Sequence, residues 1–129
     1  MSDYRPDIDG EPDPGEIVWA WVPYEDDPAQ GKDRPVLVLE AVPADDGSET
    51  YVGLMLTSKD HDRDAADEAS HGRFWMDIGT GAWDSRRRAS EVRLDRRIVL
   101  HRDAVRREGA ALGEELFETV LAAAALHAR

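Results

Sequence analysis

Two short apolar runs, separated by a polar connection, dominate the first part of the chain. Residues 17–22 and residues 35–39 are rich in β-branched and aromatic side chains, a composition typical of buried strands rather than helices. Prolines and a glycine between them predict a long exposed loop. We therefore expect strands over residues 16–22 and 34–42, with Arg34 where the loop re-enters the sheet.

The same reasoning predicts further strands and one helix. An Asp-Gly turn at residues 43–48 precedes a third apolar strand. The expected strands after that turn are 50–57, 74–79 and 92–101. From residue 103 the pattern becomes helical, with a turn at 103–109 and then a helix from 113 to about 128. The apolar face of this helix is expected to contain Leu116, Val120, Leu121 and Ala124.

These elements indicate an α+β protein with one antiparallel sheet. The chain has 129 residues, enough for one domain with a real core. Residues 1–14 contain three prolines, five acidic residues and few apolar ones, so we expect a flexible acidic tail there. Residues 15–129 are expected to form the single domain.

Charge and composition limit the possible environments. The formal net charge is −12, but residues 73–107 have a net charge of +5, which would suit a basic footprint on an acidic protein. The alternative is that these arginines pair with the acidic half of the molecule. The sequence contains no cysteine, no secretion signal and no apolar run long enough to span a membrane, so we expect a cytoplasmic protein.

The first two strands resemble the opening of the MazF/PemK-like toxins, the ribonuclease half of bacterial toxin–antitoxin pairs. In that family a G-x-[IV]-W strand is followed by a polar loop that ends in G-x-x-RPVL[IV]. The matching residues here are Gly15, Ile17, Val18, Trp19, Gly31, Arg34, Pro35, Val36, Leu37 and Val38.

Two later stretches extend the resemblance. The third strand ends in Thr57-Ser58, and family members have a hydroxyl that contributes to the active site at this point. Val92-Arg93-Leu94-Asp95 matches their V-R-x-D strand. Residues two apart on a strand share a face, so Arg93 and Asp95 can reach one phosphodiester. The alternatives are that Thr57 or Ser58 caps the next element, and that Arg93 and Asp95 form an exposed cross-strand ion pair.

The resemblance implies an SH3-like, strongly bent antiparallel β-barrel with a C-terminal helix. It also implies a metal-independent endoribonuclease toxin without cofactors, which cleaves single-stranded RNA to a 2′,3′-cyclic phosphate. A homodimer and a cognate antitoxin are the expected assembly and partner. The expected catalytic residues are Arg34, Thr57, Ser58, Arg93 and Asp95, with Asp95 as a base and the arginines as charge stabilisers.

Further residues are expected to contact the RNA from the first loop and an arginine-rich turn: Glu25, Lys32, Arg86, Arg87 and Arg88. The first loop lacks the histidine that several family members have, so Glu25 or Asp26 would have to replace it. This departure, with the acidic surface, favours an alternative function as a non-catalytic SH3-like interaction module.

A second alternative is a metal hydrolase. Four potential ligands have a spacing that would put them on one helical face, namely His61, Asp64, Glu68 and His71. Runs of charge of this kind usually form solvated loops or exposed helices, which is the simpler interpretation.

Overall fold

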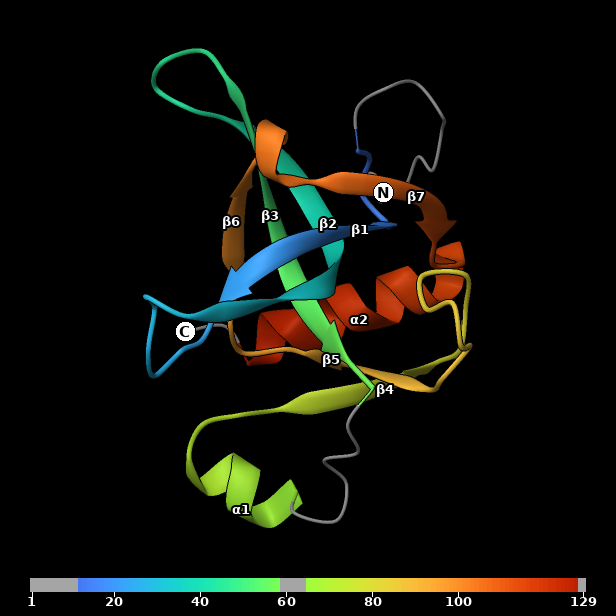
Figure 1. Ribbon diagram of the computed structural model, residues 1–129. Coiled ribbons are helices and arrows are strands. Elements are labelled where there is room, and N and C mark those ends of the chain that lie inside the picture. Colours follow the sequence, from blue (N-terminus) through green and yellow to red (C-terminus); the bar gives the residue numbers. More distant parts are fainter. Residues whose placement is uncertain (1–11, 59–64, 128–129) are drawn as a thin grey trace.

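A computed structural model describes residues 12–58 and 65–127, whose strands form one strongly curled antiparallel sheet (Figure 1). The strands are β1 (Glu16–Pro23), β2 (Gly31–Pro43), β3 (Glu49–Thr57), β4 (Trp75–Gly79), β5 (Ser90–Arg93), β6 (Ile98–His101) and β7 (Arg106–Ala111). The helices are α1 (Ala65–Ser70), the 3₁₀ turn η2 (Arg102–Ala104) and the C-terminal α2 (Glu114–Leu126). This arrangement confirms the expected SH3-like α+β fold with a bent sheet and a C-terminal helix.

The sheet curls because its long strands change partners along their length. The strand order is β4-β5-β3-β2-β1-β7, and β6 also pairs with β3. The first half of β2 pairs with β1 and its second half with β3. The register shifts between Val38 and Glu40, and such bulges increase the bend and twist of a strand.

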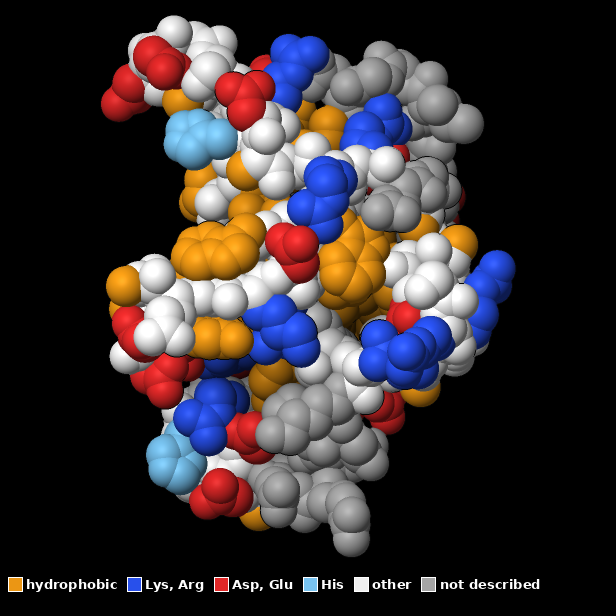
Figure 2. Space-filling view, in the orientation of Figure 1, with side chains coloured by type: hydrophobic (Ala, Val, Ile, Leu, Met, Phe, Trp, Pro, Cys, Tyr) orange, Lys and Arg blue, Asp and Glu red, His pale blue; other side chains and the backbone are white. Residues whose placement is uncertain are grey.

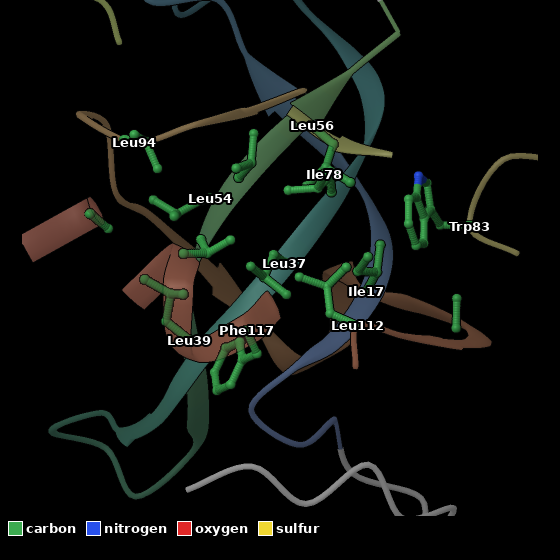
Figure 3. Close-up of a cluster of buried hydrophobic side chains, with 14 residues drawn as sticks. Ile17, Leu37, Leu39, Leu54, Leu56, Ile78, Trp83, Leu94, Leu112 and Phe117 are labelled. Atoms are coloured by element: carbon green, nitrogen blue, oxygen red, sulfur yellow. The ribbon is translucent and has the colours of Figure 1, made fainter. Parts of the chain in front are cut away.

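Both faces of the central strands are buried, which explains their continuous apolar runs. One cluster lies between the sheet and α2 and includes Ile17, Leu37, Leu54 and Phe117 (Figure 3). The other cluster lies on the opposite face and contains the alternate residues Val18 of β1, Val36 of β2 and Tyr51 of β3, together with Leu100 of β6. Of the predicted helix face, Val120 and Ala124 are buried, whereas Leu116 and Leu121 are only partly buried. The fully buried Phe117 was missing from that prediction.

The first loop is shorter than predicted, because β2 begins at Gly31 rather than Arg34. Tyr24 N donates to Gln30 O at 2.9 Å and closes the loop over residues 24–30. Arg34 therefore lies within the strand, opposite Ala20 of β1. A side chain at Gly31 would meet Val22 O at 2.5 Å and the Trp21 ring at 2.6 Å, so this close strand approach requires glycine.

The predicted fifth strand over residues 92–101 is wrong as a single element. It divides into β5 and β6, which are separated by a bend that begins at Leu94. Phe74 N donates to the Asp95 side chain at 2.8 Å, and Leu94 N donates to Phe74 O at 2.8 Å. A side-chain carboxylate thus takes the place of a main-chain acceptor and ends the ladder there.

The predicted turn over residues 103–109 is also wrong in part. Residues 106–111 form β7, which pairs with β1 at the edge of the sheet. The pairing includes an ion pair in which Arg107 Nη2 lies 2.6 Å from an oxygen of the buried Glu16. Residues 106–111 do not alternate between apolar and polar side chains, so the sequence contains no periodic signal for this strand.

The predicted tail falls mostly outside the described residues. Of residues 1–14, only 12–14 are described, and Pro12 is buried. The helix α1 lies beyond β4, at the end of the molecule away from β7 (Figure 1). Among the helices of residues 12–58 and 65–127, none has the length and apolar character needed to cross a bilayer.

Candidate active site

A hollow of about 470 Å³ opens between the β1–β2 loop, the end of β3 and the bend after β5. Its lining residues are Pro23, Tyr24, Glu25, Asp26, Arg34, Met55, Thr57, Glu68, Arg73, Trp75, Arg93 and Arg96. Three residues that the sequence assigned to catalysis, Arg34, Thr57 and Arg93, are among them. The fold thus brings together side chains from β2, β3 and β5 that are far apart in sequence.

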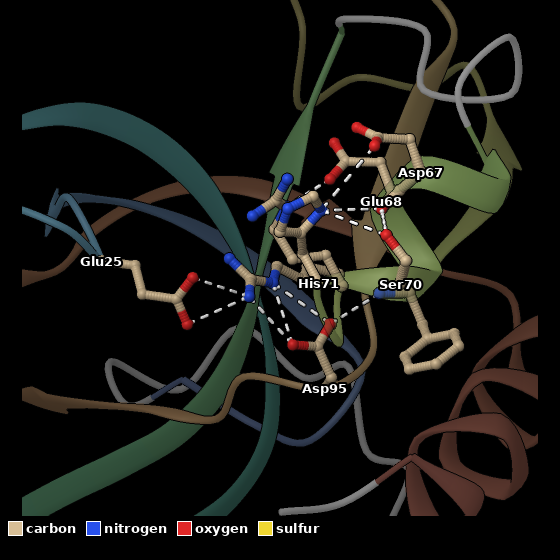
Figure 4. Close-up of polar contacts among 9 residues, drawn as sticks. Glu25, Asp67, Glu68, Ser70, His71 and Asp95 are labelled. Atoms are coloured by element: carbon tan, nitrogen blue, oxygen red, sulfur yellow. Dashed lines mark hydrogen bonds and ion pairs between the residues drawn. The ribbon is translucent and has the colours of Figure 1, made fainter.

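Two carboxylates at this hollow, Glu25 and Asp95 (Figure 4), both accept hydrogen bonds from Arg93. Its Nε donates to Asp95 Oδ1 at 3.1 Å and Oδ2 at 3.2 Å, and its Nη2 donates to Asp95 Oδ2 at 2.9 Å. The same Nη2 donates to Glu25 Oε1 at 2.9 Å and Oε2 at 3.1 Å. The guanidinium carbon also lies 5.9 Å from the centre of the Trp75 ring, within cation–π range.

These contacts keep Arg93 charged although only 4% of it is exposed. Burial by itself lowers the pKa of the guanidinium, but the hydrogen bonds to Asp95 and Glu25 raise that pKa above its ordinary value. The pair with Asp95 is buried and forms across a single bend, so the alternative of an exposed cross-strand pair is wrong.

Asp95 lies beneath Arg93 rather than at the surface of the hollow. Only 2% of it is exposed, and it does not line the hollow. Besides Arg93, its Oδ1 accepts a hydrogen bond from Phe74 N. A carboxylate with this many donors fixes the position of the guanidinium above it, and it is poorly placed to touch a substrate.

Arg34 and Thr57 also line the hollow. Arg34 is half-buried and makes no ion pair with any residue in 12–58 or 65–127, so its charge faces the hollow without a described counter-ion. Thr57 is the last residue of β3, and it pairs with Glu91 of β5. Both side chains reach the hollow because β2 and β5 flank β3 in the sheet.

A second hollow of about 110 Å³ adjoins the first and shares Arg34 and Thr57 with it. Lys32, Ser58 and Arg88 line this smaller space, as does the half-buried Trp19. The Trp19 indole is held in place because its Nε1 donates to Trp83 O at 2.9 Å. Three more predicted residues, Lys32, Ser58 and Arg88, therefore lie near the end of β3.

The predicted arginine-rich turn is organised by one buried carboxylate, Asp84. Its Oδ1 accepts from Arg86 N at 2.9 Å and its Oδ2 accepts from Arg88 Nε at 2.8 Å. Burial raises the pKa of Asp84, but the hydrogen bonds from Arg88 and Arg86 outweigh burial and leave it below the ordinary value. Arg86 and Arg87 are exposed and line neither hollow, whereas Arg88 is already paired.

Sequence reasoning missed two cations of the larger hollow. Arg96 donates from Nη2 to Pro23 O at 2.9 Å and so holds the base of the β1–β2 loop. Arg73 forms an ion pair with Glu68 and joins α1 to the wall. The basic stretch after residue 72 was a signal for both, but nothing in the sequence indicated which arginines would turn inward.

The proposed metal ligands are only partly described. His61 and Asp64 lie outside the described residues, and Glu68 pairs with Arg73. His71 follows α1, and its Nδ1 lies 2.9 Å from the carbonyl oxygen of Asp67. Within the described part of the chain, no three His, Cys, Asp or Glu side chains are grouped so that they could hold a metal ion.

Comparison with known proteins gave one family. A sequence model of the family described as PemK-like, MazF-like toxin of type II toxin-antitoxin system matches residues 13–127. The match includes every strand described above, both sides of each hollow and α2. A comparison with curated proteins gave no match.

Proposed function

This chain belongs to the PemK-like, MazF-like toxins of type II toxin–antitoxin systems, and we propose that it is a metal-independent endoribonuclease acting on single-stranded RNA. Membership of this family implies an antitoxin partner. The observation that supports the proposed activity is the meeting of Arg34, Thr57 and Arg93 in one hollow. Two guanidinium groups and a hydroxyl are donors suited to the oxygens of a phosphodiester.

The reaction needs a proton acceptor, charge stabilisation and a leaving group. Glu25 lines the hollow, and in our proposal its carboxylate takes the proton of the ribose 2′-hydroxyl. The 2′-oxygen then attacks phosphorus and the bond to the 5′-oxygen breaks, which leaves a 2′,3′-cyclic phosphate. Arg34 and Arg93 stabilise the added negative charge, and solvent protonates the departing 5′-oxygen.

The other predicted residues act around this centre. Asp95 positions Arg93 and does not itself touch the RNA, which replaces the role of base that the sequence suggested. Thr57 donates to a phosphate oxygen, while Lys32 and Ser58 contact the neighbouring nucleotide in the smaller hollow. The substrate must be RNA because DNA lacks the attacking 2′-hydroxyl. The homodimer implied by the resemblance is part of the same proposal.

Cleavage of a labelled single-stranded RNA in the presence of EDTA tests this function. We expect wild-type cleavage to continue under chelation and Arg34→Ala to be slower by about 10²–10³-fold, the usual loss when one stabiliser of transition-state charge is removed. Arg97→Ala is the matched control, because this exposed arginine lies on a different hollow, beside Phe117 and Leu121 of α2. A substrate with 2′-deoxyribose at the cut site should remain intact.

One observation favours the alternative of a non-catalytic SH3-like module. Glu25 already accepts hydrogen bonds from Nη2 of Arg93, a donor that would otherwise be open to a phosphate. If the wild-type protein cleaves no RNA under any metal condition, the module is the better description. Activity that disappears with EDTA and returns with zinc or manganese would instead refute the metal-independent mechanism.

A further inference from the structure

Arg93 is bound by two carboxylates that differ in depth. Asp95 belongs to the same bend and its side chain is 1% exposed, whereas the side chain of Glu25 is 38% exposed. Glu25 comes from the β1–β2 loop, 68 positions away in sequence, and unlike Asp95 it lines the hollow; Figure 4 shows the two carboxylates apart from each other. Arg93 thus has a buried partner, Asp95, and a partly exposed partner, Glu25, which a ligand in the hollow can displace.

The removable partner stands where a substrate phosphate would bind. A carboxylate and a phosphate offer a guanidinium the same kind of charged oxygen acceptor, so they compete for its N–H groups. Glu25 places both oxygens within 3.1 Å of Nη2, the donor nearest the loop. An RNA phosphate can contact this nitrogen fully only after Glu25 has left it.

The surrounding loop is held without Glu25. Arg96 binds Pro23 O at its base, and Tyr24 N and Asp27 N make hydrogen bonds within the loop to Gln30 O and Tyr24 O. A glutamate has three rotatable side-chain bonds, so rotation of this side chain alone can expose Arg93. The loop backbone does not need to open.

We propose that Glu25 is a built-in competitor of the RNA phosphate, which masks Arg93 in the free protein. This inference rests on the proposed function, since it assigns Arg93 to phosphate binding. It adds a selection step, because a ligand must displace Glu25 before it gains Nη2 of Arg93. A single phosphate gains little from this exchange, whereas an RNA strand that also contacts Arg34 and Lys32 gains additional contacts and can displace the carboxylate.

The test measures binding without cleavage. The probe is a labelled single-stranded oligoribonucleotide in which every 2′-hydroxyl is methylated, and its affinity is followed by fluorescence anisotropy. Glu25→Gln keeps the shape of the side chain and removes its charge. Asp26→Asn is the matched control, since Asp26 lines the same hollow but makes no ion pair among the described residues.

We expect Glu25→Gln to bind the probe about two- to fivefold more tightly than Asp26→Asn does, the scale of a partly exposed ion pair. A second variant separates masking from net charge. Glu25→Asp keeps the charge but is one methylene shorter, so its carboxylate no longer reaches Nη2 in the same loop position. It should also bind more tightly than the wild type.

Equal affinities of Glu25→Gln and Asp26→Asn would overturn the proposal, because only general charge repulsion would then remain. Weaker binding by Glu25→Gln would also overturn it, because the carboxylate would then help to hold the RNA instead of competing with its phosphate. A wild-type protein that binds the probe but never cleaves RNA refutes the proposed ribonuclease, yet it leaves this comparison of affinities intact. Thermal unfolding of each variant verifies that the fold is retained.

Discussion

Replacing Asp95 by asparagine keeps the size of the side chain and removes the negative charge beneath Arg93. In the wild-type protein this carboxylate accepts hydrogen bonds from Arg93 Nε and Nη2 and from Phe74 N. An asparagine has only one side-chain oxygen, so its NH₂ group must face at least one of these donors. We therefore expect Asp95→Asn to destabilise the folded state as well as to disturb the active site.

The size of the effect follows from burial. Breaking a buried ion pair by removing one partner costs about 3–5 kcal/mol, because the remaining charge has lost its compensation. Glu25 continues to contact Arg93 from the hollow, so we expect the lower end, about 3 kcal/mol. For a chain of 129 residues each kcal/mol corresponds to about 4 °C in Tm, which gives a decrease of about 12 °C.

Urea unfolding, followed by tryptophan fluorescence, measures this loss directly, and a thermal melt provides the Tm. The matched control is Asp33→Asn, the same kind of substitution, which removes the carboxylate of Asp33 from its ion pair with Arg106. That pair has an N–O distance of 3.2 Å, and its two side chains are 54% and 51% exposed. Exposed pairs contribute at most about 1 kcal/mol, so the control should unfold almost like the wild type.

An Asp95→Asn protein as stable as the control would refute this reasoning. It would show that the contacts of Asp95 with Arg93 and Phe74 contribute little to the folded state. The original hypothesis from the sequence, in which Asp95 is the base of the cleavage reaction, would then regain support. A stability loss near the expected value, together with slower cleavage, supports a positioning role.

Two further predictions concern the arginine-rich turn. Arg86→Ser and Arg87→Ser should each flatten the slope of log K against log salt for RNA binding by about 0.7. Arg97→Ser is the control and should leave this slope unchanged. Unchanged slopes in all three variants would exclude Arg86 and Arg87 from the RNA interface. Because the pKa of Asp84 is lowered in the folded state, its stabilising effect is present above about pH 4 and is lost as the pH falls through the lower folded pKa. Urea midpoints measured between pH 6 and pH 2 should therefore fall more steeply for the wild type than for Asp84→Asn, and parallel curves would contradict this.

The sequence predicted those parts of the fold that contain a strong apolar pattern. The runs at residues 17–22 and 35–39 became β1 and the centre of β2, because burial on both faces needs continuous apolar residues. The third and fourth strands and the Asp-Gly turn were also found. In that turn Asp46 Oδ1 accepts a hydrogen bond from Ser48 N at 2.9 Å, as this turn chemistry predicts.

The elements that the sequence missed depend on contacts made only in the folded chain. β5 and β6 separate because Asp95 reaches the backbone of Phe74, 21 positions earlier. β7 forms at a sheet edge from charged residues, and its Arg107 pairs with Glu16, 91 positions away. A local pattern of hydrophobicity contains no information about either contact.

The candidate site was predictable as a set of residues but not as an arrangement. Arg34, Thr57 and Arg93 came from motifs, and the curled sheet brings them to one hollow. Their relation to the carboxylates was not predictable, because Asp95 could have been a surface base and Glu25 an ordinary loop residue. Only the depth of each side chain assigns the two carboxylates different roles.

The distribution of charge was open to two interpretations, and the structure favours the one in which the arginines pair with carboxylates of the same molecule. The segment from 73 to 107 has ten basic side chains, and at least five are in ion pairs with carboxylates: Arg73, Arg88, Arg93, Arg106 and Arg107. In the view of Figure 2, basic and acidic side chains are accordingly interspersed, without a continuous basic field.

Under the proposed function, a protein with a net charge of −12 would hold RNA through a few positioned cations and not through its overall field. Arg34 is the cation best placed for this, because it lines both hollows and has no ion pair within residues 12–58 and 65–127. In our proposal, Arg93 contacts the phosphate as well once Glu25 has been displaced from its Nη2. Since general attraction is weak, a phosphate gains most from the protein at the one place where both guanidinium groups can reach it, which is where the proposed cleavage takes place.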